Sequence, residues 1–175
     1  MALIYRAHFA FAKTPRISSK GINTSAVFGF ANTILEVINK EKPDYLGVAF
    51  DTPAPTFRHV EYTPYKAQRQ EQPEDITIAI PYVKRLVEAM DIPLLILDGY
   101  EADDVIGTIA TAAERDGWEV HIVSGDLDML QLVTKKVHLM HTAKGGADAI
   151  VEYDPERVFA RYGLTPEQMV DFKFK

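Results

Sequence analysis

Hydrophobic positions along the chain alternate between a helical period and short apolar runs. In residues 23–41, Val27, Ala31, Ile34 and Ile38 recur every three or four positions, which predicts an amphipathic helix. Apolar runs bounded by proline, glycine or acidic residues predict strands between the helices. The predicted helices cover residues 23–41, 73–90, 101–117, 128–133, 154–163 and 165–172, and the predicted strands cover 45–51, 92–97, 118–126 and 136–141.

The ends of the predicted helices carry typical boundary residues. Asn23, Thr24 or Ser25 can cap the helix over 23–41, and Gly117 stands near the end of the helix over 101–117. Pro81 lies within 73–90, where it predicts either a bend or the true beginning of that helix.

Alternating strands and helices predict an α/β fold, with a parallel twisted sheet covered by helices on both faces. In such sheets, ligands bind beyond the carboxyl ends of the strands. Asp51, Glu101 and Asp126 each follow a predicted strand within a few residues. We therefore expect an acidic site at one edge of a single sheet.

Residues 52–73 interrupt this alternation and show no clear period. Such a long connection is typical of a functional loop or a disordered one. It interleaves basic and aromatic side chains, which suits contact with phosphates and stacked bases, although a polar surface loop is the alternative. The basic members are Arg58, His59, Lys66 and Arg69, and the aromatic ones are Phe57, Tyr62 and Tyr65.

Composition adds limits and one asymmetry. The 175 residues are expected to form one domain, and the absence of cysteine excludes disulfides and zinc–thiolate sites. Residues 1–70 hold nine basic and five acidic side chains, whereas 71–131 hold three and fourteen, despite a net charge of only −6. This division fits a polyanion bound beside a cation site, or two ordinary solvated faces. With neither a membrane span nor a secretion signal in the sequence, we expect a cytoplasmic location.

The acidic residues are concentrated in two short stretches, GYEADDVIG and IVSGDLDML. Asp103 and Asp104 fall in the first turn of a predicted helix, where carboxylates also cap backbone N–H groups. Capping does not explain the whole set, because carboxylates that converge repel one another. Oxygen ligands without histidine or cysteine select Mg²⁺ or Mn²⁺. The candidate metal ligands are Asp51, Glu101, Asp103, Asp104, Asp126 and Asp128.

The five histidines show no spacing typical of metal ligands. His121 and His138 lie within apolar strands, so we expect them to be packed in the core.

Four motifs together resemble a known family. The segments VAFDTPAPTFRH, YKAQRQEQPED, GYEADDVIGT and VSGDLDMLQLV are similar, in this order, to the 5′→3′ exonuclease domain of bacterial DNA polymerase I and its flap-endonuclease relatives. The resemblance implies a resolvase-like, or PIN-like, core that acts on 5′ ends and 5′ flaps of DNA in replication and repair. It also implies that the six acids above bind two metal ions and are catalytic.

The resemblance assigns DNA-binding roles as well. Tyr65, Lys66 and Arg69 match a helical arch, here residues 52–73, which holds the single-stranded 5′ end. Arg58 matches a basic residue at the base of the arch, and Arg6 one beside the site. The partner is DNA and not a membrane, and the protein is expected to be a monomer or part of a larger polymerase chain.

Two departures from the family define the expected extent of the domain. Family members place a strand ending in aspartate before the segment that matches residues 1–10, which itself reads as a helix. They also continue beyond residues 165–172 into a helix–hairpin–helix. We therefore expect an incomplete domain, truncated at both ends and without its first strand.

Three functions follow from these patterns. The first is a Mg²⁺-dependent 5′→3′ exonuclease and 5′-flap endonuclease. The second is a catalytically impaired fragment that still binds DNA. The third is a Mg²⁺-dependent small-molecule phosphatase that uses Asp126 and Asp128.

Overall fold

The computed structural model describes residues 1–62, 71–142 and 150–172. The chain divides into two compact units, Leu3–Val105 together with Met1, and Ile106–Lys175 together with Ala2. No helix in the described part of the chain is long and apolar enough to cross a membrane.

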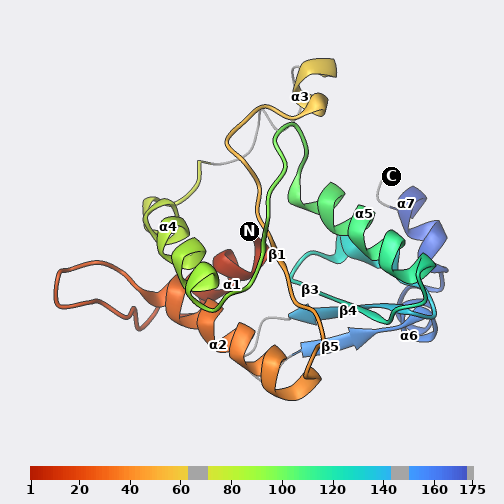
Figure 1. Cartoon of the computed structure of the whole chain (residues 1–175), viewed down its shortest axis with the longest axis horizontal. Helices are drawn as coiled ribbons and strands as arrows, with labels where there is room; N and C mark the ends of the chain where they lie inside the picture. The colour runs from red at the N-terminus through yellow and green to blue at the C-terminus, as the bar shows by residue number, and fades with distance from the viewer. Residues whose placement is uncertain (63–70, 143–149, 173–175) are drawn as a thin grey trace. The chain divides into compact units, whose positions relative to one another are not determined.

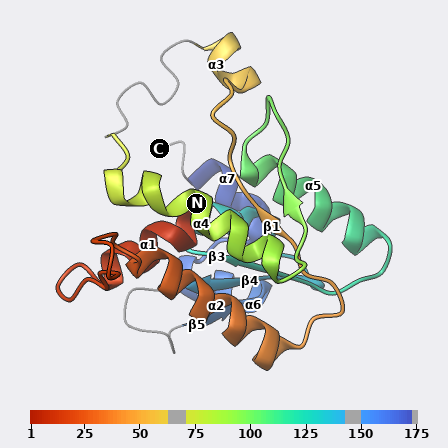
Figure 2. The same cartoon turned by 60° about the vertical axis from the view of Figure 1, so that its left-hand side comes forward.

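The first unit is a helical layer beside a short parallel strand pair (Figure 1). Its helices are α1 (Ala2–Ala10), α2 (Ser25–Glu41), α3 (Phe57–Glu61) and α4 (Glu74–Ala89), and its strands are β1 (Val48–Ala49) and β2 (Leu94–Leu95). α2 and α4 lie side by side in both views (Figure 2). Their apolar faces enclose a core that includes Ile4, Phe30, Ile34, Val83 and Val87.

The helix ends of this unit follow from local chemistry. Thr24 is the N-cap residue of α2, while the Asn23 side chain accepts a hydrogen bond from the Ser25 N–H at 3.0 Å. α4 begins at Glu74, so Pro81 lies inside the helix and does not mark its beginning. Glu74 and Asp75 occupy the first turn of α4, where their charges favour the positive end of the helix dipole.

The second unit is a three-stranded sheet packed against helices. α5 (Ala102–Arg115) has its first turn in the first unit and continues into this one. It is followed by β3 (Val120–Ser124), the 3₁₀ helix η1 (Leu127–Leu132), β4 (Val137–Thr142) and β5 (Ile150–Tyr153). α6 (Pro155–Tyr162), the 3₁₀ helix η2 (Pro166–Gln168) and α7 (Met169–Phe172) follow.

The side chains of the second unit's sheet alternate between its two faces. Ile122, Leu139 and Tyr153 point into a core with Ala110 of α5 and Val158 of α6. The opposite face therefore carries the residues between them in each strand.

The predicted α/β class is confirmed, but the sheet differs from the expectation in two ways. The strands form two separate sheets, β1–β2 and β3–β4–β5, instead of a single one. β1–β2 and β3–β4 are parallel as predicted, whereas β5 runs antiparallel to β4. The sequence prediction contained neither β5 nor α3, because each has only four or five residues and shows no usable period.

Candidate functional site

The carboxyl ends of β1 and β2 bring the first two predicted acids together. Because the strands are parallel, with Ala49 opposite Leu95, the segments that follow them leave the same edge of the sheet. Asp51 follows β1, and its Oδ1 accepts a hydrogen bond of 3.0 Å from the Ala102 N–H, next to Glu101. This bond joins the end of one strand to the beginning of α5.

The first turn of α5 holds the other acids of this unit. Asp104 Oδ2 accepts a hydrogen bond of 3.0 Å from the Glu101 N–H, and Asp103 lies in the same turn. Asp51 and Asp104 thus bind backbone N–H groups at the helix start, where the helix dipole favours negative charge. The capping interpretation is therefore correct for Asp104, and Asp51 makes a similar contact from the end of β1.

Arg58 of α3 forms the main ionic contact of the site. Its Nη1 and Nη2 each donate a 2.7 Å hydrogen bond to one carboxylate oxygen of Asp104. Its Nη1 also lies 3.8 Å from Glu101 Oε2. This two-pronged geometry is the strongest kind of arginine–carboxylate pair.

Local packing fixes the position of α3. The Phe57 N–H donates to the Gly99 carbonyl at 3.1 Å, and Gly99 has the positive φ of 85° that a residue with a side chain rarely adopts. The Arg58 guanidinium lies 4.5 Å from the centroid of the Phe57 ring. At the N-terminus of α3, Thr56 and His59 form a capping box that begins the helix.

The α-amino group of Met1 lies in the same region as Asp51 and Asp103. Burial lowers its pKa, and the negative charges of Asp51 and Asp103 act in the opposite direction.

Asp126 and Asp128 belong to the second unit, where they follow β3. Asp126 is the N-cap residue of η1, and its Oδ1 accepts a hydrogen bond of 2.9 Å from the Asp128 N–H. The Asp126 N–H in turn donates to Ser124 Oγ at 3.0 Å. These bonds form a tight turn that fixes the Asp126 carboxylate at the strand end.

The remaining predicted site residues are the DNA-binding candidates Arg6, Tyr65, Lys66 and Arg69. Arg6 is half-buried on α1. Tyr65, Lys66 and Arg69 lie outside the described residues, so the predicted arch over 52–73 is described only in part, through α3.

The prediction that His121 and His138 are core residues is wrong. Both lie on the sheet face opposite the core, and His121 is exposed. Among the described residues, one group of metal-ligand type has all its donor atoms within 4.8 Å of one another, and it consists of His121, His138 and Glu152. Sequence spacing did not reveal this group because strand register, and not separation along the chain, brings the three together.

The donor set of the predicted acidic site suits a hard divalent cation. All six candidate ligands offer carboxylate oxygens, which Mg²⁺ and Mn²⁺ prefer. Within the first unit, such an ion would have to share Asp104 and Glu101 with Arg58, which contacts both carboxylates.

Comparisons with known proteins show the family of the chain. Residues 1–163 match the family model of the 5′-3′ exonuclease N-terminal resolvase-like domain. DNA polymerase I of Bacillus subtilis is 44% identical over 173 residues, covering 98% of this chain and 19% of the polymerase. The 5′-3′ exonuclease of Aquifex aeolicus is 39% identical over 171 residues, covering 98% of this chain and 57% of that protein.

Solved structures identify the fold. The bacteriophage T5 flap endonuclease, in a complex with DNA and metal ions, has a TM-score of 0.69 at 20% identity and covers 98% of this chain and 62% of its own. The T5 5′-exonuclease with divalent zinc ions bound has a TM-score of 0.70 at 20% identity, with the same coverage of 98% and 62%. At this level of identity the similarity supports the fold alone.

The structure is an α/β domain with the PIN-like fold of these neighbours. The chain belongs to the 5′-3′ exonuclease N-terminal resolvase-like domain family. It spans about one fifth of the length of the polymerases it matches and 57% of the Aquifex aeolicus exonuclease.

Proposed function

We propose that this chain carries the metal-dependent nuclease site of a 5′→3′ exonuclease and 5′-flap endonuclease acting on DNA in replication and repair. Family membership favours this function over a small-molecule phosphatase. The observation that carries the proposal is the Asp51–Ala102 hydrogen bond, which holds a strand-end carboxylate against the acid-rich beginning of α5.

The proposed metal ligands are the six acids predicted from the sequence. Asp51, Glu101, Asp103 and Asp104 come from the first unit, and Asp126 and Asp128 from the second. Mg²⁺ or Mn²⁺, as two ions, would activate water and stabilise the leaving oxygen of a phosphodiester. The chain's own backbone N–H groups orient the carboxylates before any ion binds, as the bonds to Asp51, Asp104 and Asp126 illustrate.

The proposed DNA contacts come from the basic and aromatic side chains. Asp104 holds the Arg58 guanidinium beside the first turn of α5. We propose that its positive charge attracts a backbone phosphate of DNA that approaches the acids. Arg6, Tyr65, Lys66 and Arg69 are proposed to hold the single-stranded 5′ end, with Tyr65 stacking on a base. We propose that the protein acts as a monomer or as the nuclease part of a polymerase chain.

Cleavage of a 5′-flap duplex tests the proposal. The wild-type chain is expected to release the flap with Mg²⁺, and Asp51→Asn and Asp126→Asn are expected to remove that activity. Asp44→Asn is the matched control, because Asp44 is an exposed carboxylate outside the site. Cleavage that persists with a chelator or in both site variants would show that the metal mechanism is wrong.

DNA binding without cleavage is the second candidate function. It is favoured by the Arg58–Asp104 pair, which already neutralises one of the proposed ligands. In that case the wild-type chain would bind flapped DNA in a salt-sensitive manner and release no product, and Lys66→Ala with Arg69→Ala would weaken binding. Metal-dependent product release by the wild-type chain would contradict it.

A further inference from the structure

Two histidines and one glutamate meet on the sheet of the second unit, apart from the acids of the proposed nuclease site. We propose that His121, His138 and Glu152 form a binding site for a transition-metal ion of the Zn²⁺ type. The proposal concerns the second unit alone and does not depend on nuclease activity.

The parallel pairing of β3 and β4 places the two histidines next to each other. His121 and His138 are direct register partners, so their side chains leave the sheet on the same face. Their rings are nearly parallel, with an interplanar angle of 8° and centroids 6.0 Å apart. Two imidazoles held in this way present their nitrogens to the same region of space.

The antiparallel strand β5 supplies the third group. Tyr153 pairs with Leu139 on the core face, so Glu152, one residue before it, lies on the same face as His138. Glu152 Oε1 lies 2.7 Å from His138 Nδ1. One donor atom from each of the three residues lies within 4.8 Å of the others.

The site is open to solvent and held by regular backbone. The side chain of His138 is 25% exposed and that of Glu152 is 50% exposed, so an ion can reach them from outside. Each ligand stands on a different strand of one hydrogen-bonded sheet. A metal ion would therefore link three strands whose relative positions the backbone already fixes.

The ligand chemistry selects the class of metal. Imidazole nitrogens suit zinc, copper, nickel and iron, in contrast to the all-carboxylate set that suits Mg²⁺. Two histidines and a glutamate are a known zinc ligand set in which the fourth position remains open to water. Zinc–ligand bonds of about 2.0–2.1 Å require donor atoms roughly 3.4 Å apart, so small side-chain rotations close the present group around an ion.

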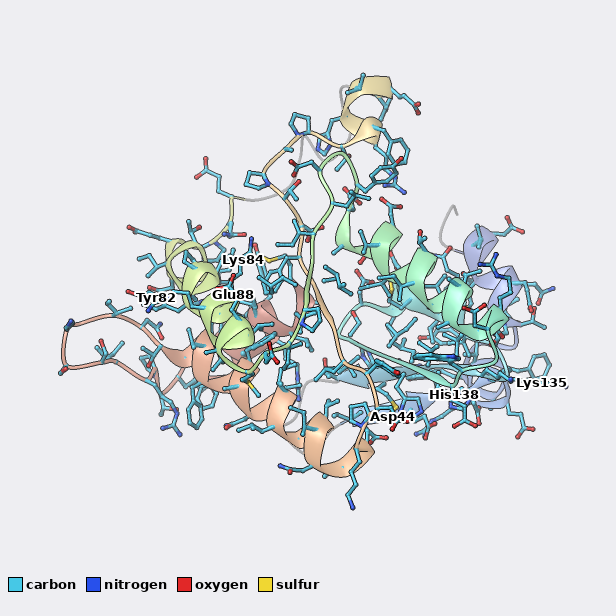
Figure 3. All side chains as sticks on the ribbon, in the orientation of Figure 1. Asp44, Tyr82, Lys84, Glu88, Lys135 and His138 are labelled. Atoms are coloured by element: carbon cyan, nitrogen blue, oxygen red, sulfur yellow. The ribbon has the colours of Figure 1, made fainter. Side chains whose placement is uncertain are left out.

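The hollow around the three ligands carries charges of both signs. Glu119, Lys135 and Lys136 line the same hollow as the three ligands, and its volume is about 230 Å³. Figure 3 labels two residues of this lining, His138 and Lys135. Lys136 Nζ donates to the Gly117 carbonyl at 3.0 Å, which holds its charge at the rim of the hollow. The carboxylates of Glu119 and Glu152 offset the positive charges of Lys135 and Lys136, so the preference for a metal ion rests on the imidazole and carboxylate donor atoms and not on net charge.

Calorimetric titration of the full 175-residue chain with ZnCl₂, in excess Mg²⁺, tests the proposal. The excess Mg²⁺ competes for carboxylate-only sites, and one Zn²⁺ site per chain is expected to require the two histidines. The double variant His121→Gln, His138→Gln is expected to lose that site. Glu152→Gln is expected to weaken it by at least about tenfold, because loss of even an outer partner of a metal ligand costs about 10- to 100-fold.

Two controls separate these ligands from their surroundings. Glu119→Gln changes a carboxylate in the same hollow that is not one of the three ligands, and it is expected to retain Zn²⁺ binding. His141→Gln removes a histidine of the same strand that lies on the opposite face, and it is also expected to retain binding. Circular dichroism shows whether each variant is folded. If the double histidine variant does not fold, the Zn²⁺ affinity of Glu152→Gln tests the proposal by itself.

The proposal is overturned if the wild-type chain shows no Zn²⁺ site in excess Mg²⁺. It is equally overturned if the site persists at full affinity in the folded double variant or in Glu152→Gln. Co²⁺ gives a second readout, because its visible absorption is expected to indicate nitrogen and oxygen ligands in the wild type and to disappear with the histidines.

Discussion

Arg58 and Asp104, 46 residues apart in the chain, are joined by two parallel hydrogen bonds of 2.7 Å each. The pair connects α3, which lies inside the long basic segment, to the first turn of α5. It thereby fixes an arginine proposed to contact DNA beside a carboxylate proposed to bind metal. This relationship supplies the first two predictions.

Arg58→Lys is expected to destabilise the chain, because an ammonium group cannot reproduce the two-pronged contact. The Arg58 side chain is 33% exposed, so solvent screening limits the loss to about 1 kcal/mol. Urea unfolding measures it. A double-mutant cycle with Asp104→Asn isolates the pair, and a coupling energy near zero would contradict the prediction.

Arg58→Ala is expected to increase the affinity of the chain for Mn²⁺ severalfold, because it removes a positive charge that competes for Asp104 and Glu101. The same change is expected to weaken binding of flapped DNA. Mn²⁺ titration followed by electron paramagnetic resonance measures the first effect. Arg85→Ala, which changes an arginine of α4, is the matched control, and equal Mn²⁺ affinity in wild type and Arg58→Ala would contradict the prediction.

Substitutions of Asp51 are expected to separate structure from chemistry. Asp51→Asn retains an oxygen that can accept from the Ala102 N–H, whereas Asp51→Ala does not. Both are expected to lose metal-dependent cleavage, but only the alanine variant should lose about 1 kcal/mol of unfolding free energy. Thermal or urea unfolding of the pair, beside the flap assay, distinguishes them. Full cleavage by Asp51→Asn would exclude a metal-binding role for this carboxylate.

Two glycine substitutions in helices are expected to have opposite effects on stability. A Cβ at Gly29 would lie 2.7 Å from the Cβ of Ala7, so Gly29→Ala must push α1 and α2 apart and is expected to cost about 1–3 kcal/mol. A Cβ at Gly107 would meet only the Leu132 side chain, at 3.5 Å. Gly107→Ala is therefore expected to stabilise α5 by up to about 1 kcal/mol. Urea unfolding of both variants measures the difference, and equal effects would contradict it.

The placement of Asp51 beside the beginning of α5 was predictable, because it depends on local pattern and on a general property of parallel strands. Apolar runs ending near Asp51 and Glu101 predict strands, and parallel strands end at one edge. The Ala102–Asp51 bond is the result. Asp126 was expected at the edge of the same sheet, but β3 belongs to the other sheet. The contact of Arg58 with Asp104 was not predictable from pattern alone, since residues 52–73 have no period that places α3.

The histidine group was missed for a different reason. The apolar run over 136–141 predicts a strand, but it does not state which of its faces meets the core. That assignment depends on the pairing of Leu139 with Tyr153 in β5. Because β5 has four residues and includes the charged Glu152, its sequence gives too short a pattern for a strand prediction. Without β5, the shared face of His138 and Glu152 could not be derived.

The hydrogen bond from Phe57 to Gly99 has a consequence for exchanging parts between relatives. The left-handed backbone at Gly99 presents its carbonyl to α3 two residues before Glu101, so the helix that bears Arg58 and the turn that bears Asp104 share one attachment point. A chimera that imports residues 52–62 from another family member must import 96–104 with them. The two stretches should therefore be exchanged together. Replacing one alone would misalign the Arg58 guanidinium and the Asp104 carboxylate.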